Sequence, residues 1–338
     1  MKIGLRTVKT GIAVALGLLA VQLLNLESPF FVTIAALIGM QPTVTDSWKV
    51  GRNRILGTVA GTIFGLLTAL ILPGHFLLAG IGVIILILFM NRVGIPEGII
   101  ISCVVFISIF MVTQEDVVAY ALSRLLDTVI GISIALLVNY FVFPPKYDRQ
   151  AMTEIHRDMT AIYLLQNKIL GMLLGKEPIA VEEMNGWLDQ LLEEMAETKK
   201  LADLQEKEDK LNVYGSVRYK EINLVHRMTT DMYQHLKNLA SLAEKPLSED
   251  SAKQMETFLE KLYEKLIHAE PAMEKDPLSI PNKMKELKEE VSRVRRAIKS
   301  QEVFQRLASE EIIHLMVVAY NVNEIAGKIE LITLQQFD

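Results

Sequence analysis

The sequence predicts an all-α membrane protein: six transmembrane helices arranged as an inverted repeat of three, followed by a cytoplasmic antiparallel helical bundle. Charge is distributed very unevenly along the 338 residues. Residues 1–145 hold 8 of the 35 Lys and Arg and 6 of the 40 Asp and Glu, which leaves 27 and 34 for residues 146–338. A long, nearly charge-free half followed by a highly charged half predicts two domains, a transmembrane domain over 1–145 and a cytoplasmic domain over 146–338.

Long apolar runs in the first half predict the six spans. A bilayer core needs about 20 predominantly apolar residues per helix, with a range of roughly 17–25. Four runs meet this length on their own, and the run from Ile55 to Asn91 divides at Pro73-Gly74-His75 into two further spans. The four single runs are Thr10–Leu26, Ser28–Thr45, Gly98–Gln114 and the stretch from Asp127 to Pro145.

The positions of Lys and Arg predict the orientation of these spans. With the N-terminus in the cytoplasm, every Lys and Arg of the first half except Arg124 falls on the cytoplasmic side. We therefore expect a multi-pass protein of the plasma membrane with both termini in the cytoplasm and the lipid bilayer as its surroundings.

A short pattern occurs twice in this half. It consists of Arg, two apolar residues, Gly or Asp, Thr, two apolar residues and Gly. Its first copy holds Arg54, Gly57, Thr58 and Gly61, and its second copy, at an offset of 70, holds Arg124, Asp127, Thr128 and Gly131. Pro29 and Pro96, 67 residues apart, open the second and fifth spans. A unit of three spans repeated in tandem has opposite orientations in the membrane, and transporters often bind their substrate between such inverted repeats. The alternative is that six similar apolar segments share Gly, Thr and Leu by composition alone.

Each copy is expected to place an arginine at the mouth of a membrane helix. An arginine near a bilayer is costly unless it reaches water, an anion or a carboxylate. Asp127 lies three residues after Arg124 on the same helical face, so the sequence predicts an ion pair between them. That pair could be structural, or it could be a gate for which an anionic substrate competes. The glycines Gly57, Gly61 and Gly131 would let another helix approach closely.

Gln41 and Thr43 bring polar groups to the end of the second span, next to Pro42. Two interpretations stay open. These side chains line a substrate path, or they belong to an ordinary interfacial helix end. A similar alternative applies to Arg54, which lies near Lys49 and Arg52 and could reach lipid phosphate instead of a substrate.

The second half shows helical periodicity and no catalytic pattern. Apolar stripes predict helices around 155–169, 184–195, 222–239 and 258–266, and a final segment from Pro281 that bends or breaks between Ser300 and Glu311. Its histidines lack metal-ligand spacing, and no phosphate-binding loop or nucleophile motif occurs. We expect neither an enzyme nor a cofactor or metal, and the net charge of −5 argues against nucleic acid as a partner.

Several segments in order resemble one family. They are Leu5–Gly11, Gln41–Thr43, the two arginine copies and Phe143–Tyr147. Together they resemble the bacterial aromatic acid exporter family, which is related to the fusaric acid resistance proteins and, more distantly, to plant malate channels. Larger members of that family carry the membrane domain twice, so this chain resembles a half-unit. The resemblance implies a homo-oligomer, most simply a homodimer.

The expected function is therefore export of small organic, chiefly aromatic, acid anions. Arg54 and Arg124 would attract the carboxylate, Thr58 and Thr128 would donate hydrogen bonds to it, and Asp127 would hold Arg124 in the absence of substrate. Two alternatives remain open: a passive organic-anion channel, and a membrane scaffold protein that transports nothing.

Overall fold

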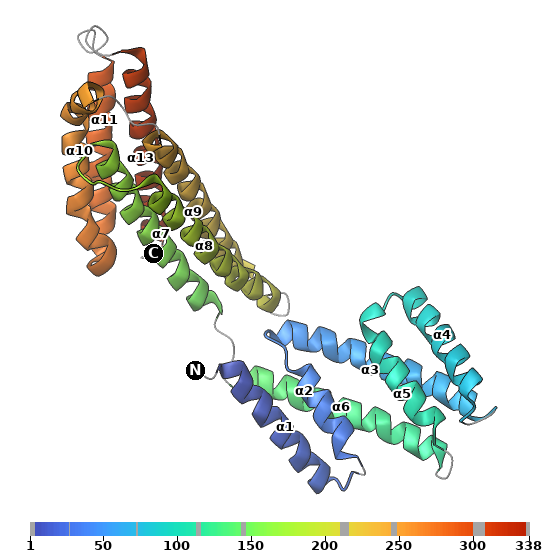
Figure 1. The fold of residues 1–338 in the computed structure, drawn as a ribbon. Helices are drawn as coiled ribbons and strands as arrows, with labels where there is room; N and C mark the ends of the chain where they lie inside the picture. Colours follow the sequence, from blue (N-terminus) through green and yellow to red (C-terminus); the bar gives the residue numbers. More distant parts are fainter. Residues whose placement is uncertain are drawn as a thin grey trace. The chain divides into compact units, whose positions relative to one another are not determined.

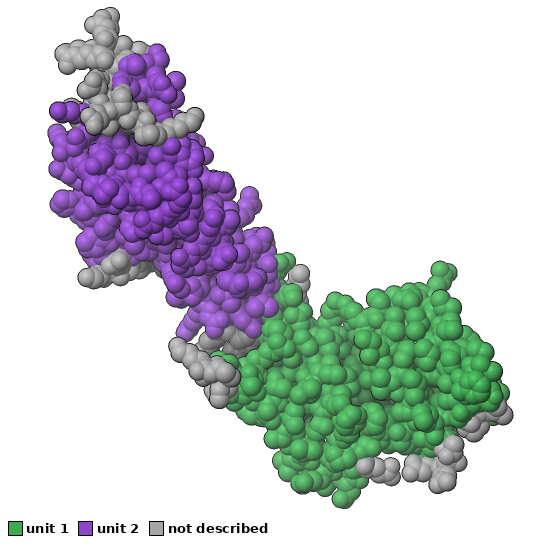
Figure 2. Space-filling view, in the orientation of Figure 1, with its two compact units in different colours: residues 1–146, 206–213 green, residues 147–205, 214–338 purple. Residues whose placement is uncertain are grey.

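The computed structural model of the chain describes residues 4–26, 28–71, 74–112, 116–142, 147–209, 216–244, 249–299 and 308–335. Every regular element in these ranges is a helix, and none of them forms a strand. The chain divides into two compact units (Figure 2). Unit 1 comprises residues 1–146 and 206–213, and unit 2 comprises residues 147–205 and 214–338.

Besides residues 206–209, which end a helix of unit 2, the described residues of unit 1 form six α-helices and one short 3₁₀ turn (Figure 1). The elements are α1 (Leu5–Leu23), α2 (Pro29–Gly39), α3 (Val44–Ala69), α4 (Phe76–Val93), η1 (Pro96–Gly98), α5 (Ile99–Phe110) and α6 (Val117–Phe141). Pro29 and Pro96 are the first residues of α2 and η1, where the missing N–H of proline costs nothing.

Three of these helices, α1, α4 and α6, are long and apolar enough to cross a membrane. The helix α2 and the segment Pro96–Phe110 are apolar but shorter. Helix α3 has 26 residues, but its first turns carry Asp46, Lys49 and Arg52. Large apolar side chains are strongly exposed on this unit, while much of its interior consists of alanine, glycine and threonine. Such a distribution is typical of helices that pack closely in lipid.

The helix boundaries correct two expectations. The run Ser28–Thr45 does not form one helix, because α2 ends at Gly39 and the Thr43 hydroxyl caps α3 by accepting the Asp46 backbone N–H at 2.9 Å. The expectation that each repeated arginine opens its helix is also wrong. Helix α3 begins at Val44 and α6 at Val117, so both arginines lie about two to three turns inside their helices.

Contacts between helices recur at the offset of 70. A Cβ atom added to Gly61 of α3 would lie 2.4 Å from the Ser102 carbonyl oxygen of α5. A Cβ atom added to Gly131 of α6 would lie 2.4 Å from the Val32 carbonyl oxygen of α2. The two glycines are 70 residues apart, and so are the two carbonyl groups. Helix α3 therefore packs on α5 in the same way as α6 packs on α2.

Unit 2 is a helical bundle. Its helices are α7 (Tyr147–Leu173), α8 (Val181–Asp209), α9 (Ser216–Ala243), α10 (Glu249–Lys275), η2 (Pro277–Ser279), α11 (Ile280–Ile298) and α13 (Ser309–Gln335). Five of them form a closed ring in which α7 contacts α9, α9 contacts α13, α13 contacts α11, α11 contacts α10, and α10 contacts α7. Their apolar stripes share one core, to which α8 adds Met184, Leu188 and Leu191.

Each apolar stripe that the sequence predicts lies within a helix of unit 2, although most of these helices extend well beyond their stripe at one end or both. Gly175 follows α7 with a left-handed φ of 67°, which favours glycine as a helix stop. The break expected between Ser300 and Glu311 falls between α11 and α13, although residues 300–307 lie outside the described residues. The proposed end of the membrane domain at residues 143–146 also lies outside them.

Asp158 of α7 makes the stability of unit 2 depend on pH. The residue is 1% exposed. Burial raises the pKa of its carboxyl group from 3.8 to about 6, although a hydrogen bond with Thr198 lowers it in part. The folded protein therefore holds a proton that the unfolded chain releases between about pH 4 and 6, so the free energy of unfolding falls as pH rises through this window. A tenfold change in proton affinity corresponds to about 1.4 kcal/mol, so the raised pKa of Asp158 gives a loss of roughly 2–3 kcal/mol above pH 6.

Replacing Asp158 by asparagine is expected to remove this loss. Thermal unfolding of the purified full-length protein at pH 5 and pH 8 would show a difference for the native protein that is much smaller for Asp158→Asn. Asp189 of α8 is exposed, so Asp189→Asn serves as the matched control and should leave the pH dependence unchanged. An unchanged pH dependence in Asp158→Asn would contradict the assignment.

Candidate functional site

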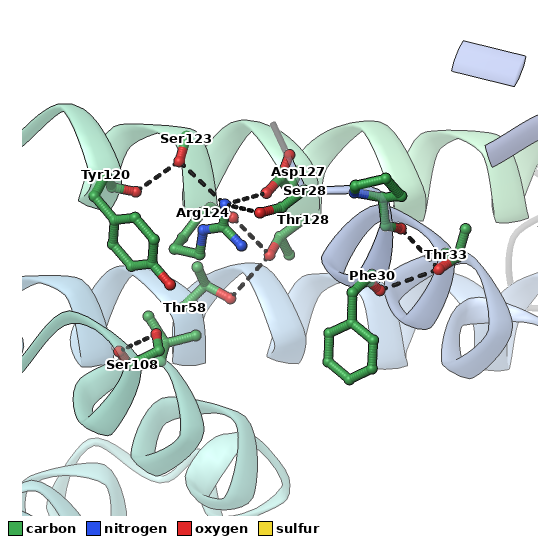
Figure 3. A network of polar contacts seen from close by, with 12 residues as sticks. Ser28, Phe30, Thr33, Thr58, Ser108, Tyr120, Ser123, Arg124, Asp127 and Thr128 are labelled. Atoms are coloured by element: carbon green, nitrogen blue, oxygen red, sulfur yellow. Dashed lines mark hydrogen bonds and ion pairs between the residues drawn. The ribbon is translucent and has the colours of Figure 1, made fainter. Parts of the chain in front are cut away.

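Helices α3 and α6 bring the two copies of the repeated pattern together. The hydroxyl oxygens of Thr58 and Thr128 lie 3.3 Å apart in the interior of unit 1 (Figure 3). Each hydroxyl also lies within hydrogen-bonding distance of the arginine carbonyl oxygen one turn earlier, at 2.9 Å for Arg54 and 3.0 Å for Arg124. The two threonines therefore mark the point where the halves of the unit meet.

Arg124 is buried beside this contact, with only 1% of its surface exposed. Its Nη2 atom donates to the Ser28 hydroxyl at 2.6 Å and the Ser123 hydroxyl at 3.3 Å. The same atom lies 3.1 Å from Oδ2 of Asp127, in the ion pair that the i, i+3 spacing predicts. Ser28 directly precedes α2. Arg124 therefore connects α6 to the start of α2, although the two residues are far apart in the sequence (Figure 3).

Two aromatic rings lie against the guanidinium group. Its central carbon is 4.1 Å from the ring centroid of Phe31 on α2 and 4.7 Å from that of Tyr120 on α6. Rings in this position stabilise a cation through their π faces. The arginine thus sits between aromatic surfaces in a water-poor interior, where its charge interacts strongly with any anion that enters.

The guanidinium group keeps hydrogen-bonding capacity that the described residues do not use. Its Nε and Nη1 atoms are buried, and neither has a hydrogen-bond partner among the residues that the structure describes. A buried donor without a partner costs free energy, about 1–3 kcal/mol for a neutral group and more for a charged one. An anionic ligand that accepts from these N–H groups would recover that cost.

Arg54, the counterpart in the first copy, has different surroundings. It is 6% exposed, and within the described part of the chain its side chain forms no ion pair and its buried Nε atom has no hydrogen-bond partner. The position that corresponds to Asp127 is Gly57, which packs against Ile101 and the Gly98 carbonyl group. Among the described residues, the first copy therefore offers a cation without a neighbouring carboxylate, whereas the second offers a cation with one.

Gln41 and Thr43 do not join this cluster. Thr43 caps α3, and the Gln41 side-chain amide donates to the Ile38 carbonyl oxygen at 2.8 Å. Both contacts are those of helix ends. The Gln41 carbonyl oxygen also accepts from Asn139 of α6 at 3.0 Å.

A second polar cluster surrounds Asn139. Its Oδ1 atom accepts from the Lys9 ammonium group at 3.0 Å, and its Nδ2 atom donates to the Ser47 hydroxyl at 2.9 Å. Lys9 is 6% exposed and so is a third buried cation of unit 1. Sequence reasoning assigned it only to the cytoplasmic positive charge, because nothing near it in the sequence indicates a partner 130 residues away.

The sequence analysis also did not predict the aromatic neighbours of Arg124. Tyr120 lies four residues before Arg124, so its helical spacing could have indicated the contact. Phe31 and Ser28 lie more than 90 residues away in sequence and carry no local signal. Among the described residues, no group of three or more His, Cys, Asp or Glu side chains could hold a metal ion.

An all-helical unit with helices able to cross a bilayer and a buried polar site between them defines a helical membrane protein. Comparison with protein families makes the assignment specific. Residues 1–142 match the model of the aromatic acid exporter family member 1, and this part of the chain is a domain of that family.

Relatives of the chain are bacterial proteins named UPF0421. One from Halalkalibacterium halodurans is 26% identical over 261 residues, which cover 76% of this chain and 73% of the relative. One from Staphylococcus haemolyticus is 28% identical over 241 residues, covering 71% and 68%. The UPF0421 protein YgaE of Bacillus subtilis is 30% identical over 148 residues, covering 44% and 42%. The first two matches extend well beyond the membrane domain into the second half.

Proposed function

We propose that this protein exports small organic acid anions, chiefly aromatic ones, across the plasma membrane. The surroundings of Arg124 carry the proposal. A guanidinium group with two nitrogen atoms that have no partner among the described residues attracts a carboxylate, and the rings of Phe31 and Tyr120 offer apolar surface to an aromatic body. The family description of residues 1–142 supports the same chemical class.

The proposed roles of the neighbouring residues follow from their contacts. The substrate carboxylate accepts from Nε–H or Nη1–H of Arg124 and competes with Asp127 for Nη2–H. Asp127 balances the arginine charge while the site is empty, because an uncompensated cation in this interior is costly. Thr58 and Thr128 supply hydroxyl groups next to the arginine, and Arg54 supplies a second cation in the other half.

The proposed topology has six spans as an inverted repeat of three, with both termini in the cytoplasm. The distribution of Lys and Arg supports this orientation. The equivalent contacts of Gly61 and Gly131 support the repeat. The apolar helices α2 and α5 would cross the bilayer partly surrounded by other helices of unit 1. Each can therefore be shorter than a helix that faces lipid along its whole length. A homodimer is proposed from the resemblance to larger family members that carry the membrane domain twice, and the mass of the detergent-solubilised complex tests it.

Uptake of labelled 4-hydroxybenzoate into vesicles is the direct test. We expect accumulation in inside-out vesicles that contain the protein and none above background in empty or right-side-out vesicles. Replacing Phe31 by leucine should raise the KM for the aromatic acid about three- to tenfold, since a contact between two aromatic rings contributes roughly 0.5–1.5 kcal/mol beyond its buried area. KM for a short aliphatic acid should change less.

Phe30 provides the matched control. It precedes Phe31 on α2 but is 64% exposed, and its replacement by leucine should leave KM unchanged. Absence of uptake across a panel of aromatic acids would contradict the proposal. Single-channel currents in a planar bilayer would instead support the passive channel, because a carrier turns over too slowly to produce them.

A further inference from the structure

Unit 2 contains a cavity of about 550 Å³ between α9, α11 and α13. This volume lies in the range of roughly 300–1,000 Å³ that small-molecule sites occupy. All three helices belong to the same compact unit, and α13 contacts both of the others. The cavity is therefore a feature of unit 2 alone and is distinct from the arginine site of unit 1.

Two cations border this cavity. Arg295 and Lys299 lie one turn apart at the end of α11, and the described residues that line the cavity include no acidic side chain. Neither cation forms an ion pair within the described part of the chain. Other cations of α11 do, since Lys288 lies 2.9 Å from Glu330 and Arg293 lies 2.8 Å from Glu290. The two cations give this cavity a positive rim on a domain that is acidic as a whole.

The rest of the lining combines apolar surface with positioned amides. Ile298 is 1% exposed and forms apolar lining, while Met316 and Tyr320 lie one turn apart on α13. The Tyr320 ring meets the His235 ring edge-on at 5.7 Å. The buried amide of Asn321 accepts from Asn238 at 3.3 Å and lies 2.9 Å from Nδ1 of His235. A thioether beside an aromatic ring is favourable surface for another aromatic ring.

A second cavity in the same unit has a lining of opposite charge and serves as a comparison. It has a volume of about 440 Å³, and its lining includes Glu177, Glu194 and Glu270. The lysine in its lining, Lys168, lies 4.3 Å from the ring centroid of Trp187. Three carboxylates would repel an anion, so of these two cavities the one bordered by Arg295 and Lys299 suits an anion.

We propose that the cavity between α9, α11 and α13 binds an aromatic carboxylate. The carboxylate would lie at Arg295 and Lys299, and the ring would lie against Ile298, Met316 and Tyr320. The ligand belongs to the same chemical class as the proposed cargo, so the inference rests on the proposed function and deepens it by giving unit 2 a site that senses the cargo. The binding itself follows from the geometry of unit 2 and does not require transport.

Binding of 2-naphthoate to the purified full-length protein, measured by equilibrium dialysis, tests the inference. The double variant Arg124→Leu/Asp127→Leu provides the background, because it removes the carboxylate site proposed for unit 1. Saturable binding should persist in this background. Adding Arg295→Gln and Lys299→Gln should raise the Kd at least about tenfold. Arg296→Gln is the matched control on the same helix, because Arg296 is not part of the lining, and it should leave the Kd unchanged.

Three results would overturn the inference. The first is equal binding of 2-naphthoate after the Arg295 and Lys299 substitutions. The second is equal binding of the neutral analogue 2-naphthamide, which would exclude recognition of the carboxylate. The third is a changed oligomeric state in the Arg295 and Lys299 variants, which would make this face an interface between copies of the chain. Vesicle uptake by the Arg295 and Lys299 variants is read separately, so transport can fail or persist independently of binding.

Discussion

Replacing Arg124 by leucine is expected to abolish uptake of aromatic acids and to destabilise the membrane unit by about 3–5 kcal/mol. The loss of stability arises because the buried carboxylate of Asp127 would lose the cation that lies 3.1 Å from it. The loss of transport arises because the site would lose its guanidinium donors. Thermal unfolding in detergent and uptake into inside-out vesicles measure the two effects separately.

The double variant Arg124→Leu/Asp127→Leu separates folding from function. Removing both charges replaces a buried ion pair by apolar side chains, which is often neutral or stabilising. We therefore expect the double variant to unfold near the native temperature and still fail to transport. Arg124→Lys should also transport poorly, because an ammonium group lacks the planar fork of donors. Native-like uptake by the double variant would reduce the pair to a structural role.

Replacing Gly131 or Gly61 by alanine is expected to destabilise unit 1 by about 1–3 kcal/mol or more. The added Cβ atom would lie 2.4 Å from a backbone carbonyl oxygen in each case, Val32 for Gly131 and Ser102 for Gly61. Backbone cannot rotate away as a flexible side chain can, so α6 must separate from α2, or α3 from α5. Because the two contacts are equivalent, the two substitutions should lower the unfolding temperature by similar amounts.

Gly80 of α4 and Gly11 of α1 are the matched controls. A Cβ atom added to either one would have no neighbour within 4 Å. Alanine has the higher helix propensity, by roughly 1 kcal/mol, so Gly80→Ala and Gly11→Ala should be neutral or slightly stabilising. A loss of stability in these controls as large as that in Gly131→Ala would show that the effect is not due to helix packing.

Local patterns in the sequence predicted the helical character of both units and one contact of the site. Periodic apolar stripes located the helices of unit 2, since a helix that buries one face must repeat it every 3.6 residues. The spacing of Arg124 and Asp127 predicted their ion pair for the same reason. The start of α3 could also have been predicted from the sequence, because Thr43 followed three residues later by Asp46 is a helix-capping pattern.

The remainder of the site depends on tertiary packing. Phe31 and Ser28 reach Arg124 only because α2 packs on α6, and that packing depends on the glycine at position 131. The network of Lys9 and Asn139 likewise joins the two ends of the membrane domain sequence. For Arg54 the sequence shows Gly57 where Arg124 has Asp127, but the packing of Gly57 against Ile101 and the Gly98 carbonyl group depends on the fold.

The equivalent packing of the two halves also has an energetic consequence. Consider a second state of unit 1 in which the two halves have exchanged conformations. The contact of Gly61 with Ser102 would then have the geometry that Gly131 and Val32 have now, and the contact of Gly131 with Val32 would have the present geometry of Gly61 and Ser102. Helix packing would therefore contribute nearly equally to the stability of both states. The energy difference between them would then fall on the residues that break the equivalence, which include Asp127 against Gly57 and the cluster of Lys9 and Asn139. The Asp127 carboxylate would contribute to the preference of the empty protein for one state, and an acid that displaces it from Arg124 would shift that balance.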